Sequence, residues 1–325
     1  MPKIVIVDLD FEEQNIERRM IAQAGKDIAV FQSRKADDII RNAADADGII
    51  TSYGDFPRRV FEALPKLKVV SRTGVGYDSI DIQAATDNGV AVCTHPGYGT
   101  EVVSDHTITL AMDVLRRTNE LDADMRQGLW NHHARRPLGQ AHGRTYGVVG
   151  MGEIGRAVAR KAAGLGFKVI CTSRSLKPGR RTPEGYDIYE LDVLLELADV
   201  VSFHCALTPE TTHLLNEERL RHMKPTAVVV NTSRGPIVDT IALARALEAG
   251  KLWGAGLDVF ESEPLDMAHP ILLAPHTVLT PHAAYWSEES GEELRTRATK
   301  AVIDILQGRR PMDCLNPEVL DRLGL

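Results

Sequence analysis

The strongest structural signal in this chain is the stretch TYGVVGMGEIG, residues 145–155. The apolar run Thr145–Val149 is typical of a buried strand, and three glycines follow it at the spacing of a dinucleotide-binding turn: Gly150, Gly152 and Gly155. The first glycine permits the tight turn, the second lets the backbone approach a pyrophosphate, and the third allows the following helix to pack closely on the strand. The stretch therefore predicts a strand–turn–helix unit that binds a nicotinamide dinucleotide.

The choice between NAD and NADP depends on the residues around this turn. The amides at the start of the expected helix, at Glu153 and Ile154, would face the negative phosphates. After the next strand, Lys168–Thr172, an acid is expected if the cofactor is NAD, but Ser173 and Arg174 stand there instead. An arginine presents forked, permanently charged donors to a phosphate, so the sequence favours NADP over NAD. The alternative is that Arg174 is merely exposed and that either cofactor is accepted.

Short apolar runs alternate with amphipathic runs on both sides of the turn. In the first third of the chain, strands are expected at 3–8, 28–31, 48–51, 69–72 and 91–93, with helices at 12–24 and 80–88. From the turn onward, strands are expected at 145–149, 168–172, 200–204, 227–231, 254–259 and 277–280. The helices of this second series are expected at 155–165, 191–197, 216–223, 240–250 and 287–307. This alternation is typical of parallel sheets covered by helices on both faces.

One long helix is expected to join the two series. Its apolar spacing runs from Thr100, which can cap it, to about Gly128, and an irregular arm follows at 131–143. We therefore predict an α/β fold of two domains with parallel sheets. A Rossmann-type cofactor domain at 100–287 would be inserted into a flavodoxin-like substrate domain made of 1–99 and 288–325. A ligand commonly binds between two such domains.

Composition narrows the class of protein further. The chain has 325 residues and a net charge of −7, which disfavours nucleic-acid binding. No apolar run is long enough to span a membrane, and the sequence after Met1 does not resemble a signal peptide, so a cytoplasmic enzyme is expected. The four cysteines lack the spacing of zinc ligands, and adjacent His132 and His133 would point in different directions. No metal site is predicted.

Three later stretches indicate the chemistry. They are Asn-Thr-Ser-Arg-Gly-Pro-Ile-Val-Asp at 231–239, Gly-Leu-Asp-Val-Phe-Glu-Ser-Glu-Pro at 256–264 and Leu-Thr-Pro-His-Ala-Ala at 279–284. In this order, after the glycine turn, they resemble the D-isomer-specific 2-hydroxyacid dehydrogenase family. The resemblance implies that Arg234, Glu263 and His282 are catalytic. An arginine would bind the substrate carboxylate and keto oxygen, a histidine would exchange the proton, and a glutamate would favour its protonated form.

The same resemblance extends to the other residues of the site. In the stretch 71–81, it implies that the backbone at Gly74, Val75 and Gly76 holds the substrate carboxylate, because glycine lets a backbone come close to a ligand. Tyr53 is placed to touch the side group of the substrate. Tyr285, which follows the His-Ala-Ala run, would form an aromatic wall on the substrate.

Further residues would face the cofactor or a second subunit. By family comparison, Thr232, Ser233 and Asp258 would lie near the nicotinamide. His204 ends a strand and could either line the adenine side or pack in the core. The family also implies a homodimer formed through the long helix and the arm near residues 130–143.

We therefore expect a reversible NAD(P)-dependent reduction of a small 2-keto acid to the D-2-hydroxy acid. Glyoxylate and hydroxypyruvate are reasonable first substrates. The alternative is a nucleotide-sensing binding protein with weak turnover, because residues 282–288 resemble the C-terminal-binding protein corepressors of the same family. That match is partial, since those proteins carry an acid where Ser173 stands.

Overall fold

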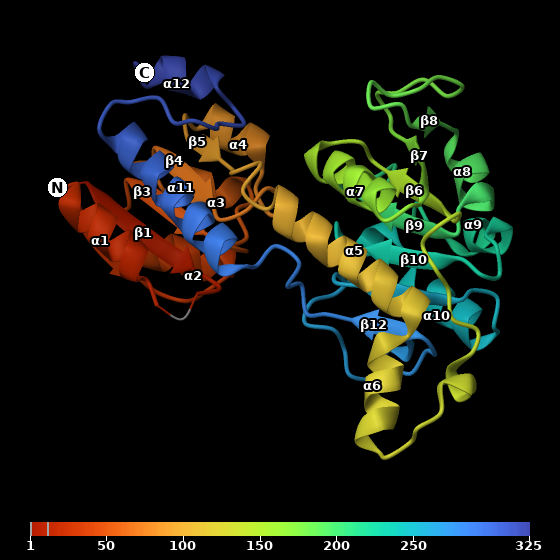
Figure 1. Ribbon diagram of the computed structural model, residues 1–325. Coiled ribbons are helices and arrows are strands. Elements are labelled where there is room, and N and C mark those ends of the chain that lie inside the picture. Colours follow the sequence, from red (N-terminus) through yellow and green to blue (C-terminus); the bar gives the residue numbers. More distant parts are fainter. Residues whose placement is uncertain (1, 12) are drawn as a thin grey trace. The chain divides into compact units, whose positions relative to one another are not determined.

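The computed structural model describes residues 2–11 and 13–325, which form two compact units. Unit 1 comprises Met1–Tyr98 and Ser287–Leu325, and unit 2 comprises Gly99–Trp286. The expected boundaries lie one residue later than these. Figure 1 shows the elements of both units, each of which has its own parallel sheet and its own core.

Unit 1 is built on a five-stranded parallel sheet in the order β2-β1-β3-β4-β5. This is the flavodoxin-like order that the sequence predicts. Its strands are β1 (Lys3–Asp8), β2 (Asp27–Val30), β3 (Gly48–Thr51), β4 (Val69–Arg72) and β5 (Ala91–Cys93). Its helices are α1 (Asn15–Gln23), α2 (Ala36–Asn42), α3 (Arg58–Ala63), α4 (Ile82–Asp87), α11 (Glu288–Leu306) and α12 (Glu318–Arg322).

Helices cover both faces of this sheet. One apolar cluster joins the strands to α2, α3 and α4, and another joins them to α1, α11 and α12. Figure 1 shows α11, in blue, beside α1, and α11 also packs on β3 and β4. Because both faces are covered, the central strand β3 is buried along its whole length rather than at alternate residues, as is usual for a parallel sheet.

Unit 2 is built on a seven-stranded parallel sheet in the order β12-β11-β10-β9-β6-β7-β8. Its strands are β6 (Thr145–Val149), β7 (Lys168–Thr172), β8 (Asp187–Ile188), β9 (Val200–Phe203), β10 (Val228–Asn231), β11 (Gly254–Leu257) and β12 (Thr277–Leu279). Counted within the unit, the first six strands have the Rossmann order, and β12 extends one edge.

The helices of unit 2 lie on both faces of its sheet. They are α5 (Thr100–Arg116), α6 (Thr118–Arg126), α7 (Glu153–Gly164), α8 (Leu191–Leu197), α9 (Glu217–His222) and α10 (Thr240–Glu248), with 3-10 turns η1 (His132–Arg135), η2 (Gly235–Ile237) and η3 (Pro270–Leu272). The helix α5 packs against α7 and over β10 and β11. On the opposite face, α8, α9 and α10 cover a second apolar cluster.

The prediction of a single long helix from Thr100 to about Gly128 is wrong. The chain leaves the helix at Arg117, whose φ of 51° is left-handed, so α5 ends and α6 begins there. The guanidinium of Arg117 lies over the ring of Trp253, 5.3 Å from its centroid, and this packing favours the bend. Gly99 rather than Thr100 occupies the cap position of α5.

Other differences from the expected elements are small. The helix expected at 12–24 is α1, which begins at Asn15, and Glu12 lies outside the described residues. The short elements α2, α3, α12 and β8 escaped detection because a few residues show too little periodicity. Of the helices in the described part of the chain, none has the length and apolarity that crossing a membrane requires.

Candidate active site

The glycine turn after β6 has the form the sequence predicts. Gly150 has a φ of 99°, and a Cβ there would lie 2.7 Å from the backbone nitrogen of Cys205. A Cβ on Gly155 would lie 1.9 Å from the carbonyl oxygen of Gly150, so these two glycines are required by the packing of the chain itself. A Cβ on Gly152 would meet no atom within 4 Å, which leaves open space where a pyrophosphate would approach.

The helix α7 begins directly after this turn, at Glu153. Its first amides are therefore available to an anion, and the positive end of the helix dipole points toward the turn. The side chain of Glu153 accepts a hydrogen bond of 3.4 Å from the Thr100 hydroxyl, and that of Ile154 packs against the apolar core. The structure of the turn therefore fits a bound dinucleotide.

The residues expected to choose between NAD and NADP follow β7. Arg174 is exposed, and the Ser173 hydroxyl lies 3.5 Å from that of Ser175. Arg181, in contrast, donates to Asp187 at 2.7 Å, so this cation is engaged within the chain. Ser173 and Arg174 thus occupy the place after the second strand at which the ribose is expected.

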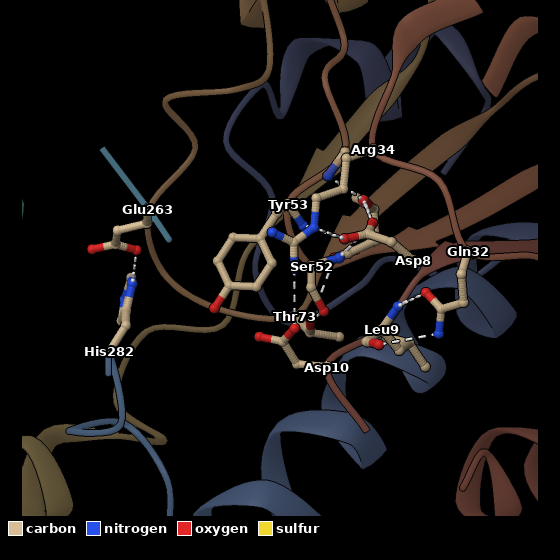
Figure 2. A network of polar contacts seen from close by, with 12 residues as sticks. Asp8, Leu9, Asp10, Gln32, Arg34, Ser52, Tyr53, Thr73, Glu263 and His282 are labelled. Atoms are coloured by element: carbon tan, nitrogen blue, oxygen red, sulfur yellow. Dashed lines mark hydrogen bonds and ion pairs between the residues drawn. The ribbon is translucent and has the colours of Figure 1, made fainter. Parts of the chain in front are cut away.

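The proposed acid–base pair lies on two neighbouring loops. Glu263 follows β11 and His282 follows β12, and these strands are adjacent in the sheet. Because adjacent parallel strands end at the same edge, the two side chains meet: His282 Nδ1–H donates to Glu263 Oε2 over 2.6 Å (Figure 2). The amide of Phe260 donates to the other carboxylate oxygen over 3.0 Å. The glutamate thereby fixes the orientation of the imidazole.

The carboxylate of Glu263 is kept ionised by its surroundings. Burial by itself would raise the pKa of Glu263, but the hydrogen bonds from His282 and Phe260 and the charges of His282 and Arg234 outweigh it. The net result is a pKa below the ordinary value of 4.5. The side chains are accessible, with exposed fractions of 26% for His282 and 33% for Glu263, so the pair is open to a small ligand.

Arg234 lies after a third strand, which ends at the same edge of the sheet. It follows β10, and its backbone oxygen accepts a 2.8 Å hydrogen bond from the Asn231 side chain. One guanidinium nitrogen donates to the Ser233 carbonyl over 2.8 Å. The strands β10, β11 and β12 are adjacent in the sheet, so the three residues predicted to be catalytic lie on neighbouring loops at one edge, and the charge of Arg234 lowers the pKa of Glu263.

The side chain of Asp258 is buried and is hydrogen-bonded to the loop that carries His282. Its side chain is only 1% exposed, and its carboxylate accepts hydrogen bonds from the Thr280 hydroxyl (2.5 Å) and the amides of Ala283 (2.8 Å) and Ala284 (2.9 Å). Its carbonyl accepts the amide of His282 over 2.7 Å. Asp258 therefore anchors the loop that carries His282, and its expected contact with the nicotinamide stays a prediction.

The other residues expected near the cofactor are engaged within unit 2. The Thr232 hydroxyl lies 2.8 Å from that of Thr107, and the Ser233 hydroxyl donates to the Cys205 carbonyl over 2.7 Å. Burial lowers the pKa of His204 to about 3, and its Nε2 lies 2.8 Å from the Ser202 hydroxyl. A neutral, hydrogen-bonded ring favours the packing alternative for His204.

In unit 1, the expected carboxylate-binding loop follows β4. Gly74 has a φ of 150°, which side chains rarely adopt, and its carbonyl accepts the amide of His95 over 3.0 Å. A Cβ on Gly74 would lie 1.8 Å from a guanidinium nitrogen of Arg72. Val75 is exposed, Gly76 partly exposed and Gly74 buried, so the loop is accessible at Val75 and Gly76.

Tyr53 is held by a network that the sequence did not indicate (Figure 2). Asp8, at the end of β1, accepts the amides of Ser52 (3.1 Å) and Tyr53 (2.8 Å). Arg34 pairs with Asp8 at 3.7 Å, and its guanidinium lies over the Tyr53 ring at 4.5 Å. The register between β1 and β3 shifts just before Asp8, which aims this carboxylate at the loop. A carboxylate at the end of an otherwise apolar strand was the available signal.

Tyr285 lies next to the acid–base pair. Its ring is edge-on to that of His282, with the centroids 6.1 Å apart and the planes at 89°. It also contacts Trp286 at a centroid separation of 6.4 Å. Tyr285 is thus placed beside His282, and its expected contact with the substrate stays a prediction.

A second acid–histidine pair joins Glu261, two residues before Glu263, to His213. Glu261 accepts from His213 Nε2 (2.9 Å) and from both the amide (3.1 Å) and the hydroxyl (2.9 Å) of Thr240. These bonds fasten the loop after β11 to the start of α10. Glu261, the competitor of Glu263 in the sequence, is therefore engaged at a helix terminus.

The fold and the glycine turn define unit 2 as a dinucleotide-binding α/β unit of the oxidoreductase type. Comparison with known proteins gives its family. Residues 108–284 match the family model described as D-isomer specific 2-hydroxyacid dehydrogenase, NAD binding domain. The chain belongs to this family, as its motifs predict, and is an NAD(P)-dependent oxidoreductase with a nicotinamide cofactor.

Relatives support the same assignment along nearly the whole chain. A glyoxylate reductase of Korarchaeum cryptofilum is 41% identical over 286 residues, covering 87% of this chain and 86% of the relative. A glyoxylate reductase of Thermofilum pendens is 38% identical over 305 residues, covering 90% and 89%. The crystal structure of the TT0316 protein from Thermus thermophilus superposes with a TM-score of 0.88 at 35% identity, covering 96% and 99%.

Proposed function

We propose that this chain reduces glyoxylate, and hydroxypyruvate as a second substrate, to the corresponding 2-hydroxy acids of the D series where the product is chiral, preferring NADPH. The observation that carries this proposal is the 2.6 Å contact between His282 and Glu263 at the carboxyl edge of the dinucleotide-binding sheet. The curated relatives named glyoxylate reductase support the choice of substrate.

Arg234, His282 and Glu263 would each have a distinct role in this reaction. Arg234 binds the substrate carboxylate and polarises the keto oxygen with its permanent charge. His282 Nδ1 is committed to Glu263, so Nε2 is the atom that gives its proton to the keto oxygen as the alkoxide forms. When bound, the reduced nicotinamide supplies the hydride. In oxidation, His282 Nε2 takes the proton back.

The cofactor would be held by the glycine turn and the loop after β7. Gly150, Gly152 and the first amides of α7 would bind the pyrophosphate. Ser173 and Arg174 would bind the 2′-phosphate of NADP, since an exposed arginine rather than an acid occupies this place. Thr232, Ser233 and Asp258 would lie on the nicotinamide side.

Unit 1 would supply substrate recognition. The backbone of Gly74, Val75 and Gly76 would hold the carboxylate, and Tyr53 would face the substrate side group, to which unit 2 would add Tyr285. We propose a homodimer formed through α5, α6 and the arm, where Trp130 is 87% and Leu129 53% exposed. Light scattering that gives the mass of one chain at micromolar concentration would contradict this.

The test is oxidation of NADPH and NADH, followed by absorbance, with a panel of 2-keto acids. Oxidation of NADPH by glyoxylate that His282→Ala abolishes is the expected result. Higher kcat/KM with NADH would contradict the cofactor preference alone. Tight cofactor binding without turnover of any acid would instead support a nucleotide-sensing protein.

A further inference from the structure

A chain of hydrogen bonds reaches the His282 loop from the helix α5. His106, on α5, has its Nε2 atom 2.9 Å from the hydroxyl of Thr280. The same nitrogen lies 3.6 Å from a carboxylate oxygen of Asp258. Thr280 ends the segment that leads from β12 into the loop, two residues before His282. His106 therefore links the helix α5 to this loop.

The direction of these hydrogen bonds follows from the chemistry of the groups. The Thr280 hydroxyl donates its proton to Asp258 Oδ1 over 2.5 Å. The Thr280 oxygen must then accept from its other neighbour. His106 consequently carries a proton on Nε2 and donates it to Thr280. The order of donation is His106, Thr280, Asp258.

The last member of this chain holds the backbone around His282. The side chain of Asp258 is buried, and a buried carboxyl group requires hydrogen-bond partners in fixed positions. Besides Thr280, its donors are the amides of Ala283 and Ala284, while its carbonyl accepts the amide of His282. Asp258 thus holds the amides of three successive residues, His282 to Ala284.

This fixing matters because His282 has a strained backbone. Its φ of 53° lies in the left-handed region, where a residue with a Cβ is held only if its surroundings determine it. A small rotation of this backbone would move the imidazole relative to Glu263. Proton transfer requires correct geometry at distances of about 2.6–3.2 Å, so the rate is sensitive to such a movement.

We propose that His106 is a positioning residue for the acid–base histidine, acting through Thr280 and Asp258 on the backbone of residues 282–284. The inference rests on the proposed role of His282. The contacts of His106 run to Thr280 and Asp258 rather than to the pair or the arginine, and sequence reasoning missed it because a polar residue within a helix carries no signal of its own.

The experiment measures glyoxylate reduction by full-length variants. His106→Leu removes the donor, His106→Gln retains an N–H group that can reach Thr280, and Thr280→Val removes the relay at similar volume. Thr109→Ala is the matched control, because Thr109 is exposed on the same helix and its hydroxyl donates to the Asp105 carbonyl of that helix rather than to the loop.

We expect His106→Leu to lower kcat about three- to tenfold, the range that one lost hydrogen bond supports, with the KM for glyoxylate and the Kd for NADPH within about twofold. His106→Gln should recover at least half of kcat, and Thr109→Ala should retain all of it. Because His106 and Thr280 act in series, the double variant His106→Leu/Thr280→Val should be no slower than the slower single variant.

Three results would overturn the inference: an unchanged kcat in His106→Leu, multiplicative losses in the double variant, or a loss confined to KM or to cofactor Kd. If His106→Leu does not fold, His106→Ala, which also removes the donor, is combined with Thr280→Val and gives the same test of coupling. A wild-type chain that reduces no 2-keto acid would refute the proposed function itself, whereas an active wild type with an unaffected His106→Leu refutes only the role of His106.

Discussion

The two units present the functional groups that we propose in different ways. In unit 2, the groups are charged side chains with fixed partners, of which Glu263 and His282 at 2.6 Å are the clearest case. In unit 1, they are the backbone at Gly74 and one aromatic ring, Tyr53, with the nearby charges of Asp8 and Arg34 holding the chain in place. Charged groups can lower a reaction barrier only where charge develops, whereas a backbone and a ring select the substrate by fit.

This contrast makes a prediction about kinetics. Changes in unit 2 should mainly affect kcat, and changes in unit 1 should mainly affect KM and the choice of substrate. Both sheets are parallel, and in both the groups follow the carboxyl ends of strands, so the fold alone does not produce the difference. The difference between the units comes from the residues that follow the strands of each sheet.

The largest expected effect is in the acid–base pair. His282→Ala should lower kcat for glyoxylate reduction by about 10²–10⁴-fold, the usual contribution of a positioned proton donor. The KM should change much less, because Arg234 and the unit 1 loop remain. Steady-state rates with saturating NADPH give both constants.

The control for this prediction is the second pair in the same unit. His213→Ala removes a histidine that also contacts a glutamate, over 2.9 Å, but at the start of α10. It should retain kcat within about threefold, since the loss of one partly exposed ion pair is a small effect. If His213→Ala and His282→Ala were equally slow, the assignment of Glu263 and His282 would fail.

The next effect should appear in unit 1. Gly74→Ala places a Cβ 1.8 Å from a guanidinium nitrogen of Arg72, which must shift, and forces a side chain to a φ of 150°, which strains the loop. We expect the KM for glyoxylate to rise about tenfold, with kcat changed less, because glycine there allows the backbone to approach the ligand. The matched variant is Gly89→Ala, at a φ of 71° with no atom within 4 Å, which strains unit 1 away from the loop. An equal rise in KM for both variants would mean that strain alone is responsible.

How far the sequence predicted the molecule depends on the range of each signal. The glycine turn depends on a local pattern, and the strand order on the alternation of strands and helices. The resemblance to a family selected Arg234, Glu263 and His282, and they lie on neighbouring loops because parallel strands end at one edge. The break at Arg117 depends on packing against Trp253, which is 136 residues away in the chain. The anchoring of the His282 loop by Asp258 likewise depends on contacts that no local pattern shows.

A smaller effect should distinguish recognition by fit from recognition by charge. Arg34→Met removes the cation from the Tyr53 ring, which is then less fixed, and bulky 2-keto acids should gain about two- to fivefold in kcat/KM relative to glyoxylate. Glyoxylate has no side group, so its own kcat/KM should not change. Arg59→Met is the control, because Arg59 is 55% exposed against 56% for Arg34 and pairs with Asp37 rather than with a ring. A fall in glyoxylate turnover would show that Arg34 acts by charge.

The smallest effect concerns stability and asks whether every paired charge in unit 2 serves catalysis. Burial raises the pKa of Glu261, but hydrogen bonds from His213 and Thr240 lower it more, so it lies below the ordinary value of 4.5. A carboxyl group with a depressed folded-state pKa stabilises the fold above its unfolded pKa, and this stabilisation is lost as the pH falls through the folded value.

Glu261→Gln should therefore lower the Tm by about 1–3 °C at pH 7, a small shift because the pair is partly exposed. The gap in Tm between the variant and the wild type should close as the pH falls below about 4.5. Its kcat should stay within about twofold, since no reacting group depends on this carboxylate directly. Thermal unfolding of both proteins from pH 7 to pH 3 measures the gap. A gap that widened on acidification would mean that Glu261 is protonated in the folded chain and that the second pair is not an ion pair.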